Sequence, residues 1–293
     1  MSSASKLKVW IVNYYTSTPE NVSNPRYLEF ADYFMQAGYD VTTFNSSKIS
    51  NTVDQQELFF HRQYGQFKFV HVKSPNYAGN GLKRMMSIWA FAWRMFVHRH
   101  KFEKPDIVLH NVHTPFDYPI SWMAKRLKAR YIVEAWDMWP ENFVTFGLLS
   151  ASNPLMKLAY MMEYRLYRKA DEVVFTLEGG LDYLKNKGWT TDTGGKINIS
   201  KVHYINNGVN LEKFDNDCMN HQRDDKDLKD PNTYKIIYMG SIRLVNNVKK
   251  LIDAAAILKE NPKYRILICG DGSDRSVLEK YVTVNHIDNV VFK

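Results

Sequence analysis

The chain has 293 residues, of which 45% are hydrophobic, so it is long enough for two packed domains and too apolar to be disordered. Two cysteines are too few for a disulfide framework, no leader pattern opens the chain, and no apolar run reaches the roughly 20 residues of a membrane-spanning helix. The net charge of +8 predicts an anionic partner. Charge alone does not decide whether that partner is nucleic acid, a phosphorylated small molecule or an acidic membrane.

The amino-terminal part alternates β-rich apolar runs with segments of helical spacing. Residues 8–14 predict a strand, residues 27–37 a helix that Gly38 ends, and residues 41–44 a second strand. Further strands are predicted over residues 67–72, 107–110, 131–134, 173–176 and 201–205. Strands that alternate with helices pair in parallel through right-handed crossovers, so this part predicts a doubly wound α/β sheet.

The same alternation begins again after a polar stretch. Residues 215–232, dense in Asp, Lys and Asn, predict a solvated connection. Strands then follow over residues 234–239, 264–269 and 289–292, and helices over 247–259 and 273–281. We therefore predict two α/β domains, 1–205 and 206–293. The second series stops at an unprotected edge strand, so we expect this domain to be incomplete and the chain to be part of a longer protein.

Two glycine-containing loops follow consecutive strands of the second series. Gly240 is followed by Ser241 and Arg243, and Gly270 by Gly272. A glycine at a strand-to-helix turn lets the backbone approach a phosphate, which a nearby arginine can neutralise. The alternative is that each glycine only supplies a tight turn. Neither the dinucleotide pattern nor the P-loop pattern occurs.

The segment after the predicted strand 131–134 gathers two indoles and two carboxylates. It reads AWDMWPE and contains Trp136, Asp137, Trp139 and Glu141. Indoles stack on the apolar faces of sugars, and carboxylates bind hydroxyls or act as bases, so this segment is a candidate acceptor site. A structural loop with buried indoles is the alternative.

Two other strand ends carry polar candidates. Asn24 and Pro25 are explained by helix entry, which leaves Arg26 for binding a phosphate or an acceptor. His110 and His113 lie at another strand end and indicate a role in a cleft, but no further ligands at suitable spacing support a zinc site.

Residues 83–101 predict a basic amphipathic helix. Its apolar face comprises Met85, Ile88, Trp89, Ala92 and Phe96, and its other face comprises Lys83, Ser87, Arg94, His98 and Lys101. Contact of this helix with an anionic membrane and packing of its apolar face in the core are both open. No nucleic-acid-binding motif, nucleophile elbow or nucleophilic-cysteine context occurs.

The segment VHYINNGVNLEKF, residues 202–214, resembles the "NGVD…F" segment of the family four glycosyltransferases. Four further segments match the donor domain of that family in the same order along the chain. They are IIYMGSIR, LIDAA, RILICGDGS and NVVFK. Four segments of the first half resemble the branch of the family that builds bacterial surface polysaccharides such as capsule and O-antigen, including the fucosamine transferases. These segments are GYDVTTF, PDIVLHN, VEAWDMWPENFVTFGLLS and MEYRLYRKADEVVFTLEGGLDYL. The resemblance implies the GT-B fold, with two facing Rossmann-like domains, the second incomplete here.

The implied activity is that of a hexosyltransferase acting with retention at the anomeric carbon. A sugar would pass from a nucleotide diphosphate donor to a glycan or polyprenyl-linked acceptor, without metal, cofactor or nucleic acid. The implied location is the cytoplasm, at an anionic membrane surface on the inner face. Positive groups near Gly240 would stabilise the leaving diphosphate, and the leaving phosphate would help to take the proton of the acceptor.

The resemblance also implies site residues, position by position. Asp137 is the expected catalytic residue and would position the donor or acceptor sugar. The implied donor-binding residues are Gly240, Ser241, Arg243, Lys249, Gly270 and Gly272. The implied acceptor-binding residues are Arg26, Trp136, Trp139 and Glu141.

Several positions depart from the family pattern. Trp136 stands where many members have His, Asn246 stands where the diphosphate-binding Lys is common, and Arg243 is two residues from the usual Arg. The family's E-x7-E segment would lie beyond Lys293. Two other functions stay open: a GT-B nucleotide-sugar epimerase, which needs no acceptor, and a non-catalytic nucleotide- or glycan-binding protein.

Overall fold

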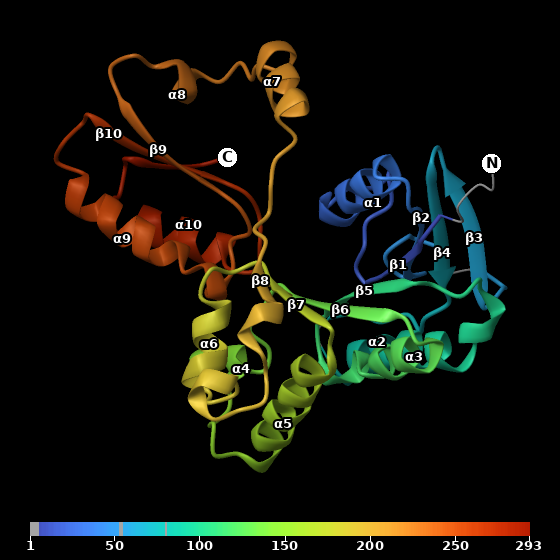
Figure 1. The fold of residues 1–293 in the computed structure, drawn as a ribbon. Coiled ribbons are helices and arrows are strands. Elements are labelled where there is room, and N and C mark those ends of the chain that lie inside the picture. Colours follow the sequence, from blue (N-terminus) through green and yellow to red (C-terminus); the bar gives the residue numbers. More distant parts are fainter. Residues whose placement is uncertain (1–5, 53–54, 80) are drawn as a thin grey trace. The chain divides into compact units, whose positions relative to one another are not determined.

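A computed structural model describes residues 6–52, 55–79 and 81–293. The chain forms two compact units, Met1–Gly208 and Val209–Lys293, which we call unit 1 and unit 2. Each unit has its own sheet, its own helices and its own hydrophobic core (Figure 1).

Unit 1 is built on an eight-stranded sheet in the order β3-β4-β2-β1-β5-β6-β7-β8. Its strands are β1 Lys8–Val12, β2 Asp40–Ser46, β3 Phe59–Tyr64, β4 Phe67–Val72, β5 Ile107–Val112, β6 Arg130–Ala135, β7 Glu172–Phe175 and β8 Val202–Tyr204. All neighbours pair in parallel except β3 and β4, which form an antiparallel hairpin. The strand order reverses at β1, which lies between β2 and β5, and open α/β sheets bind ligands at such a point.

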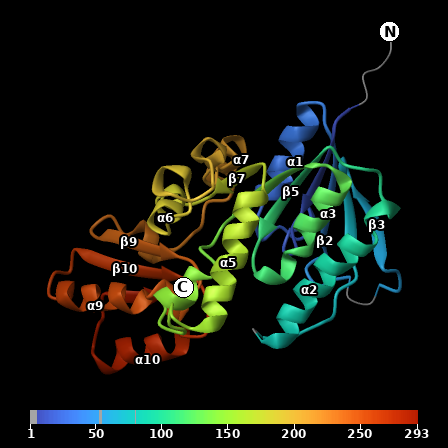
Figure 2. The same ribbon diagram turned by 60° about the horizontal axis from the view of Figure 1, so that its bottom comes forward.

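Helices cover both faces of this sheet. On one face lies α1, Arg26–Gln36, and on the other lie α2, Leu82–Val97, α3, Pro119–Leu127, and α5, Pro154–Lys169 (Figure 1, Figure 2). Unit 1 also contains α4 Glu141–Thr145 and α6 Gly180–Asn186. The larger core packs side chains of α2 and α3 against the sheet, and the smaller core lies on the α1 side. Each large apolar side chain that is fully buried there contributes roughly 1.5–3 kcal/mol.

Unit 2 has a three-stranded parallel sheet in the order β11-β10-β9. Its strands are β9 Tyr234–Met239, β10 Tyr264–Cys269 and β11 Val290–Phe292, and its main helices are α9 Val248–Leu258 and α10 Arg275–Val284. The core gathers Ile252 of α9, Ile268 of β10 and Leu278 of α10. Before the sheet come α7 Leu211–Asn220 and α8 Lys226–Lys229, which bury none of their residues.

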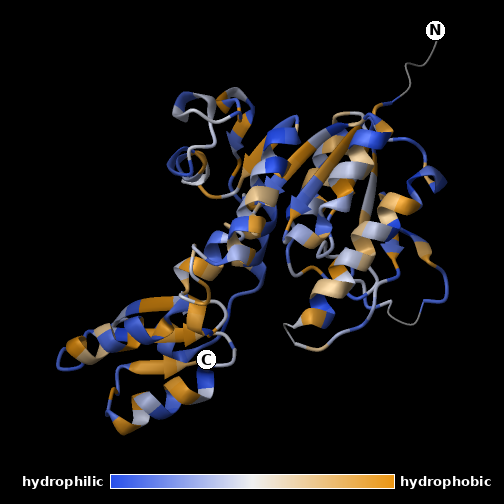
Figure 3. Ribbon diagram, turned by 90° about the horizontal axis from the view of Figure 1, so that it is seen from below, coloured by the Kyte–Doolittle hydropathy of each residue, from blue (hydrophilic) through white to orange (hydrophobic). Residues whose placement is uncertain are grey.

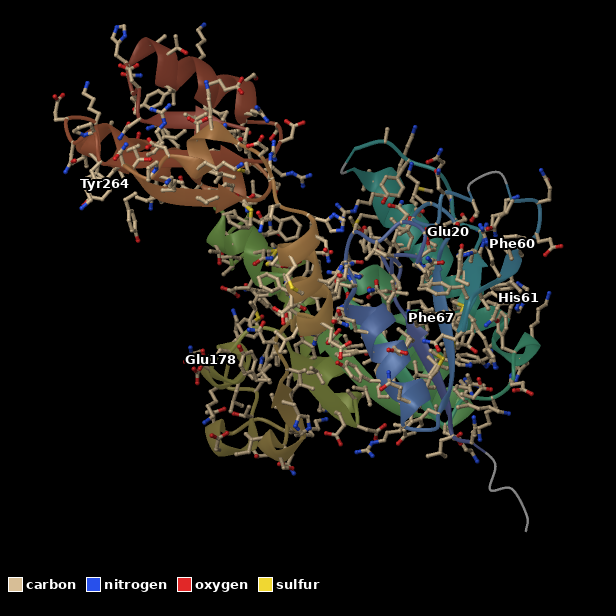
Figure 4. All side chains as sticks on the ribbon, turned by 90° about the horizontal axis from the view of Figure 1, so that it is seen from above. Glu20, Phe60, His61, Phe67, Glu178 and Tyr264 are labelled. Atoms are coloured by element: carbon tan, nitrogen blue, oxygen red, sulfur yellow. The ribbon has the colours of Figure 1, made fainter. Side chains whose placement is uncertain are left out.

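The structure confirms the predicted α/β class and the parallel sheets. It differs from the predicted elements at the helix 83–101, which ends at Val97 as α2, and in two further places. The strand β3 was not predicted; it lies at the outer edge of unit 1, where Phe60 and His61 are labelled in Figure 4. The predicted polar connection 215–232 contains part of α7 and all of α8. Both helices are solvated, so their polar composition reflects exposure rather than a lack of regular structure.

Candidate functional site

The ends of three parallel strands bring polar side chains from distant parts of the sequence to one edge of unit 1. Asn13 follows β1, His113 follows β5 and Trp136 follows β6. Since β5 pairs in parallel with both β1 and β6, these three strand ends share an edge, which we call the carboxyl edge. Open α/β sheets bind their ligands at such an edge.

Asn13 and His113 bond to each other across the β1–β5 pair. Oδ1 of Asn13 accepts hydrogen bonds from the backbone N–H of Tyr15 at 2.8 Å and from Nε2 of His113 at 2.9 Å, so Nε2 carries the imidazole proton. The ring of Tyr15 meets the imidazole edge to face, with centroids 4.7 Å apart, and Nε of Arg84 donates to the Tyr15 hydroxyl at 2.7 Å. Burial, and secondarily the charge of Arg84, lowers the pKa of His113 to about 3, so its imidazole is neutral at pH 7.

Four buried polar atoms near the ends of β1 and β5 have no hydrogen-bond partner among the described residues. They are Nδ2 of Asn13, Oγ1 of Thr16, Oδ1 of Asn111 and Oδ1 of Asp117. An unmade hydrogen bond of a buried polar group costs about 1–3 kcal/mol, so native proteins keep few of them. These four atoms are enclosed by protein, and four others lie elsewhere in the described residues, so a ligand at the carboxyl edge would reach them only after a local rearrangement.

His110 and Asp117 lie behind this edge as a buried pair. Oδ2 of Asp117 accepts the backbone N–H of His113 at 2.9 Å and lies 3.8 Å from Nε2 of His110. Burial raises the pKa of Asp117 to about 7 and, with a smaller effect of His113, lowers the pKa of His110 to about 3. His110 also bonds the Tyr131 hydroxyl at 2.8 Å. In the described part of the chain, no cluster of three or more His, Cys, Asp or Glu side chains could hold a metal ion.

Glu134, the next-to-last residue of β6, is a fully buried carboxylate. Its Oε1 atom accepts hydrogen bonds from Nε of Arg26 at 2.9 Å and from Nη2 of Arg26 at 2.6 Å. Its Oε2 atom accepts hydrogen bonds from the Tyr27 hydroxyl and from Nε1 of Trp136 at 2.8 Å. Burial and the charge of Glu134 raise the pKa of Tyr27 well above its ordinary value. These bonds compensate for the desolvation of a charged group in the core.

Arg26 donates all five of its guanidinium N–H groups within unit 1. Besides the two bonds to Glu134, Nη1 bonds the carbonyl of Asn206 at 2.8 Å and Oδ1 of Asn207 at 3.1 Å, and Nη2 bonds the carbonyl of Ile205 at 2.8 Å. The side chain thereby joins the start of α1 to the segment after β8. The acceptor contact predicted for Arg26 would have to replace one of these bonds.

The segment AWDMWPE holds its side chains in different ways. Trp136 stacks on Tyr27, with ring centroids 5.4 Å apart and planes 12° apart. Asp137 is exposed, and its carboxylate has no hydrogen-bond or ion-pair partner among the described residues. Trp139 is half-buried, meets the ring of Phe143 edge to face, and lines a small cavity. Among these side chains, Asp137 offers a carboxylate to a ligand without giving up another contact.

Glu141, at the start of α4, is held by two other helices. Its Oε2 atom accepts a hydrogen bond from the Tyr160 hydroxyl of α5 at 2.7 Å and lies 2.6 Å from Nζ of Lys187, just after α6. Partial burial raises the pKa of Glu141, but the bonds from Lys187 and Tyr160 outweigh this effect and lower it overall. A ligand contact by Glu141 would compete with these two partners.

The two glycine loops of unit 2 pack against each other through backbone atoms. The backbone N–H of Gly240 donates to the last carbonyl of β10 at 3.1 Å, and that of Ile242 donates to the carbonyl of Asp271 at 2.9 Å. A Cβ atom at Gly270 would lie 2.0 Å from the carbonyl oxygen of Gly240, and one at Gly272 would lie 2.2 Å from that of Ile242. Close packing of the loops therefore requires glycine at 270 and 272, whether or not a phosphate binds.

The polar side chains predicted to bind the donor differ in availability. Lys249 pairs with Asp253 through distances of 2.7 and 2.8 Å, and Oγ of Ser241 donates to Oδ1 of Asn246 at 3.2 Å. Arg243 is exposed, and its guanidinium has no partner in the described part of the chain. In unit 2, Arg243 is thus the predicted cation that could meet a diphosphate without losing an ion pair.

Sequence reasoning missed the buried cluster around Glu134 and the contacts of Asn13 and Tyr15. A carboxylate within an otherwise apolar strand was the available signal for Glu134, because a buried charge needs partners. For Asn13 the signal was an amide directly after an apolar strand. Neither pattern identifies the partner residues.

Comparison with known proteins places the chain among sugar-transferring enzymes. Residues 26–213 match the family described as Glycosyltransferase Family 4, and residues 220–293 match the family described as Glycosyl transferases group 1. A search of curated proteins found no match.

Several solved structures share the fold at low sequence identity. An α,α-trehalose-phosphate synthase (UDP-forming) from Burkholderia vietnamiensis is 10% identical, with a TM-score of 0.64 over 98% of this chain and 73% of that chain. An E. coli structure described as trehalose-6-phosphate bound with UDP-2-fluoro glucose is 11% identical, with a TM-score of 0.62 over 96% and 69%. Anabaena HepE in complex with UDP and glucose is 13% identical, with a TM-score of 0.56 over 98% and 68%.

The fold and the family match agree. Both units contain the Rossmann-like parallel sheets of the GT-B fold, with three strands in the second. The Family 4 match covers more than half of the chain and includes Asp137 and the Glu134 cluster. The chain therefore belongs to Glycosyltransferase Family 4.

Proposed function

We propose that the chain transfers a sugar from a nucleotide diphosphate donor to a hydroxyl group of a glycan or polyprenyl-linked acceptor, with retention at the anomeric carbon. The Family 4 match over residues 26–213, with the free carboxylate of Asp137 inside it, carries the proposal. Solved structures that share the fold are described with UDP, glucose or UDP-2-fluoro glucose, which supports a nucleotide-sugar donor.

In the proposed reaction, the bond between the anomeric carbon and the leaving diphosphate breaks. The acceptor oxygen bonds to that carbon from the same face, and its proton passes to the leaving diphosphate. Asp137 would orient sugar hydroxyls, and the buried, unpaired Nδ2 of Asn13 could donate to the sugar only after a local rearrangement at the carboxyl edge. Such positioning lowers the barrier because the reacting groups are held in the productive geometry.

Unit 2 would hold the diphosphate of the donor. Arg243 supplies a free positive charge, and Lys249 would have to exchange Asp253 for a phosphate. Gly240 and Gly270 directly follow β9 and β10, so they place the backbone of both glycine loops close to the ends of these strands. Positive groups at a leaving diphosphate stabilise the charge that develops in the transition state.

We further infer a place for the reaction in bacterial surface-polysaccharide synthesis, of the capsule or O-antigen type, at the cytoplasmic face of the plasma membrane. The inference is supported by the resemblance of the Ala135–Glu141 region and its flanking segments to that branch of the family. A polyprenyl-linked acceptor would itself lie in that membrane.

The test is an NMR-monitored reaction with a panel of UDP-, GDP- and dTDP-sugars and an undecaprenyl-diphosphate-linked N-acetylhexosamine acceptor. We expect donor consumption that requires the acceptor, and a product that keeps the anomeric configuration of the donor. Asp137→Asn should lower kcat/KM by about 100-fold, the scale of a lost positioning contact, without changing stability. Asp182→Asn, an exposed acid on α6, is the matched control and should react like the wild type.

The other outcomes separate the alternatives. Isomerisation of the donor without acceptor would assign an epimerase, and donor binding without turnover would assign a binding protein. Inversion at the anomeric carbon would contradict the retaining mechanism. Each of these three results overturns the proposal.

A further inference from the structure

The outer face of α2 carries a stripe of exposed apolar side chains. It comprises Leu82, Met86, Trp89, Trp93 and Val97, which recur every three or four residues and are 82%, 65%, 45%, 38% and 45% exposed. The buried residues of the same helix are Ser87, Ile88, Phe91, Ala92 and Met95. Unit 1 therefore buries one apolar face of α2 and leaves a second one uncovered, a combination that marks an interaction surface.

This exposed stripe corrects the sequence interpretation of the helix. Residues 83–101 predict one apolar face, which includes Trp89, and one basic face, which includes Arg94 and Lys101. In the structure Trp89 is on the solvent side, and the guanidinium of the half-buried Arg94 bonds the carbonyl of Lys73. The ammonium of Lys101 lies 6.0 Å from the centroid of the Phe59 ring. Arg94 is thus held by the protein and is a poor candidate for membrane contact, whereas Lys83 stays exposed and the exposed tryptophans are good candidates.

The exposed tryptophans belong to a continuous aromatic ladder that crosses from α2 to α3. Trp89 and Trp93 are stacked, with centroids 5.5 Å apart and planes 9° apart. Trp93 meets Phe96 at 5.6 Å, and Phe96 meets Trp122 of α3 at 5.9 Å. Trp122 is 44% exposed. Indole rings with one apolar face and one polar N–H group favour the interface between water and a bilayer.

The two helical segments that carry the ladder are basic in sequence and contain no acidic residues. Residues 82–101 contain five Lys and Arg and no Asp or Glu, and residues 118–130 contain four and none. Figure 3, which looks at this helical side of the sheet, shows hydrophobic and hydrophilic residues side by side on its helices. Protein–protein interface cores are depleted of charge, so a ladder set among cations fits an anionic surface better.

A groove of about 720 Å³ adjoins the ladder at Trp122. Its lining includes Lys125, Lys128 and Lys169, and none of these three has a carboxylate partner among the described residues. Two acidic residues also line the groove: Glu172 pairs with Arg130 at 2.5 Å, and Oδ2 of Asp171 accepts the backbone N–H of Tyr131 at 2.7 Å. Three lysines without a carboxylate partner stand against the single carboxylate of Asp171, so the groove carries an excess of positive charge.

We propose that the aromatic ladder and the adjacent basic groove dock unit 1 on the surface of a bilayer that contains anionic phospholipids. The indoles of Trp89, Trp93 and Trp122 would enter the interface, and Lys125 and Lys128 would meet lipid phosphates. Among the described residues, no helix is long and apolar enough to cross a membrane. The inference rests on the proposed function for its purpose, since a polyprenyl-linked acceptor lies in that membrane.

Sedimentation with vesicles tests this surface directly. The 293-residue chain is mixed with vesicles of phosphatidylcholine alone or with added phosphatidylglycerol. We expect binding that needs phosphatidylglycerol and weakens with salt. Lys125→Glu with Lys128→Glu should weaken it at least about tenfold, because each cation near an anionic surface contributes roughly fivefold. Trp89→Ser with Trp93→Ser should weaken it by a similar factor, because two exposed indoles leave the interface.

Matched controls exclude effects of net charge and misfolding. Lys196→Glu with Lys259→Glu changes the net charge equally at exposed sites outside the surface and should bind within about twofold of the wild type. Circular dichroism and urea midpoints should show that all variants fold. Wild-type levels of binding by both the tryptophan and the lysine variants would overturn the proposal, as would binding that ignores phosphatidylglycerol.

Light scattering and a soluble acceptor separate membrane docking from a dimer interface and from the transfer reaction itself. Light scattering could show that the wild type is a dimer and the tryptophan variant a monomer, while the variant still binds vesicles normally. In that case the ladder is an interface between copies of the chain, and the docking proposal fails. Transfer to a water-soluble acceptor should be unaffected in every variant that binds vesicles poorly. If the wild type binds vesicles but shows no sugar transfer, the proposed function is refuted and the membrane-docking proposal still stands.

Discussion

Nε and Nη2 of Arg26 donate to the same carboxylate oxygen of Glu134, at 2.9 and 2.6 Å, across 108 positions of sequence. The two side chains are 5% and 0% exposed. Desolvation of two charges is costly, and such a pair is tolerated only when the remaining polar atoms are also bonded. Here Tyr27 and Trp136 satisfy the second oxygen of Glu134, so the pair fixes the start of α1 against β6.

Glu134→Ala should destabilise unit 1 strongly. It leaves the buried guanidinium of Arg26 without its counter-charge, and breaking a buried pair in this way costs about 3–5 kcal/mol. Glu20→Ala is the control, because Glu20 pairs with Arg62 at an exposed site and should cost about 1 kcal/mol or less. Urea unfolding followed by tryptophan emission measures both, since all seven tryptophans lie in unit 1. Equal midpoints for the two variants would contradict this account of the pair.

Gly272→Ala should loosen the two glycine loops of unit 2. The new Cβ atom would lie 2.2 Å from the carbonyl oxygen of Ile242, so the backbone must move, at a cost of about 1–3 kcal/mol. Gly179→Ala in unit 1 is the control, because a Cβ atom there meets nothing within 4 Å. Amide hydrogen exchange of residues 234–242 should become faster in Gly272→Ala. Unchanged exchange would mean that the loops adapt without strain.

The parts of the fold that follow from local patterns could be predicted from the sequence. Apolar runs such as residues 67–72 and 234–239 are strands, and their alternation with amphipathic helices indicates parallel pairing. The hairpin strand β3 was missed because residues 61–63 face solvent. Its register depends on pairing with β4 through a turn at Gly65, where φ is +58°. Long-range pairing of this kind leaves little trace in an isolated segment.

The candidate site was predictable only in part, for the same reason. Asp137 lies two residues after the end of an apolar strand, so its position at the carboxyl edge could be inferred from local sequence. The bonds of Arg26 and Glu134 could not, because the partners come together only when the sheet forms. Lys249 likewise reads as a free cation in sequence, whereas Asp253, one helical turn later, neutralises it in the structure.

Asp117 gives the stability of unit 1 a pH dependence of defined sign. Its folded-state pKa of about 7 is above the ordinary value of 3.8, so the folded state holds a proton that the unfolded chain releases. Between about pH 4 and pH 7, stability from this group falls as pH rises, by at most about 1.4 kcal/mol per pH unit. His110 acts in the opposite direction, because its pKa is lowered to about 3.

Asp117→Asn isolates this contribution. The amide keeps an acceptor for the backbone N–H of His113 but cannot ionise. Urea midpoints at several pH values should show the variant gaining stability relative to the wild type as pH rises towards 7. Effects of His110 occur in both proteins and largely cancel in the difference. A difference that stays constant from pH 5 to pH 8 would mean that Asp117 is already ionised in the folded state.

Trp136→Phe separates the two contacts that hold this indole. Phenylalanine keeps a ring against Tyr27 but removes the Nε1 donor to Glu134, and hydrogen bonds to charged groups contribute about 1.5–3 kcal/mol. Trp139→Phe is the matched control in the same segment, because Nε1 of Trp139 has no partner among the described residues, and it should cost less. The two urea midpoints give the comparison. If Trp139→Phe costs as much, the bond to Glu134 contributes nothing, and stacking on Tyr27 alone would account for the position of Trp136.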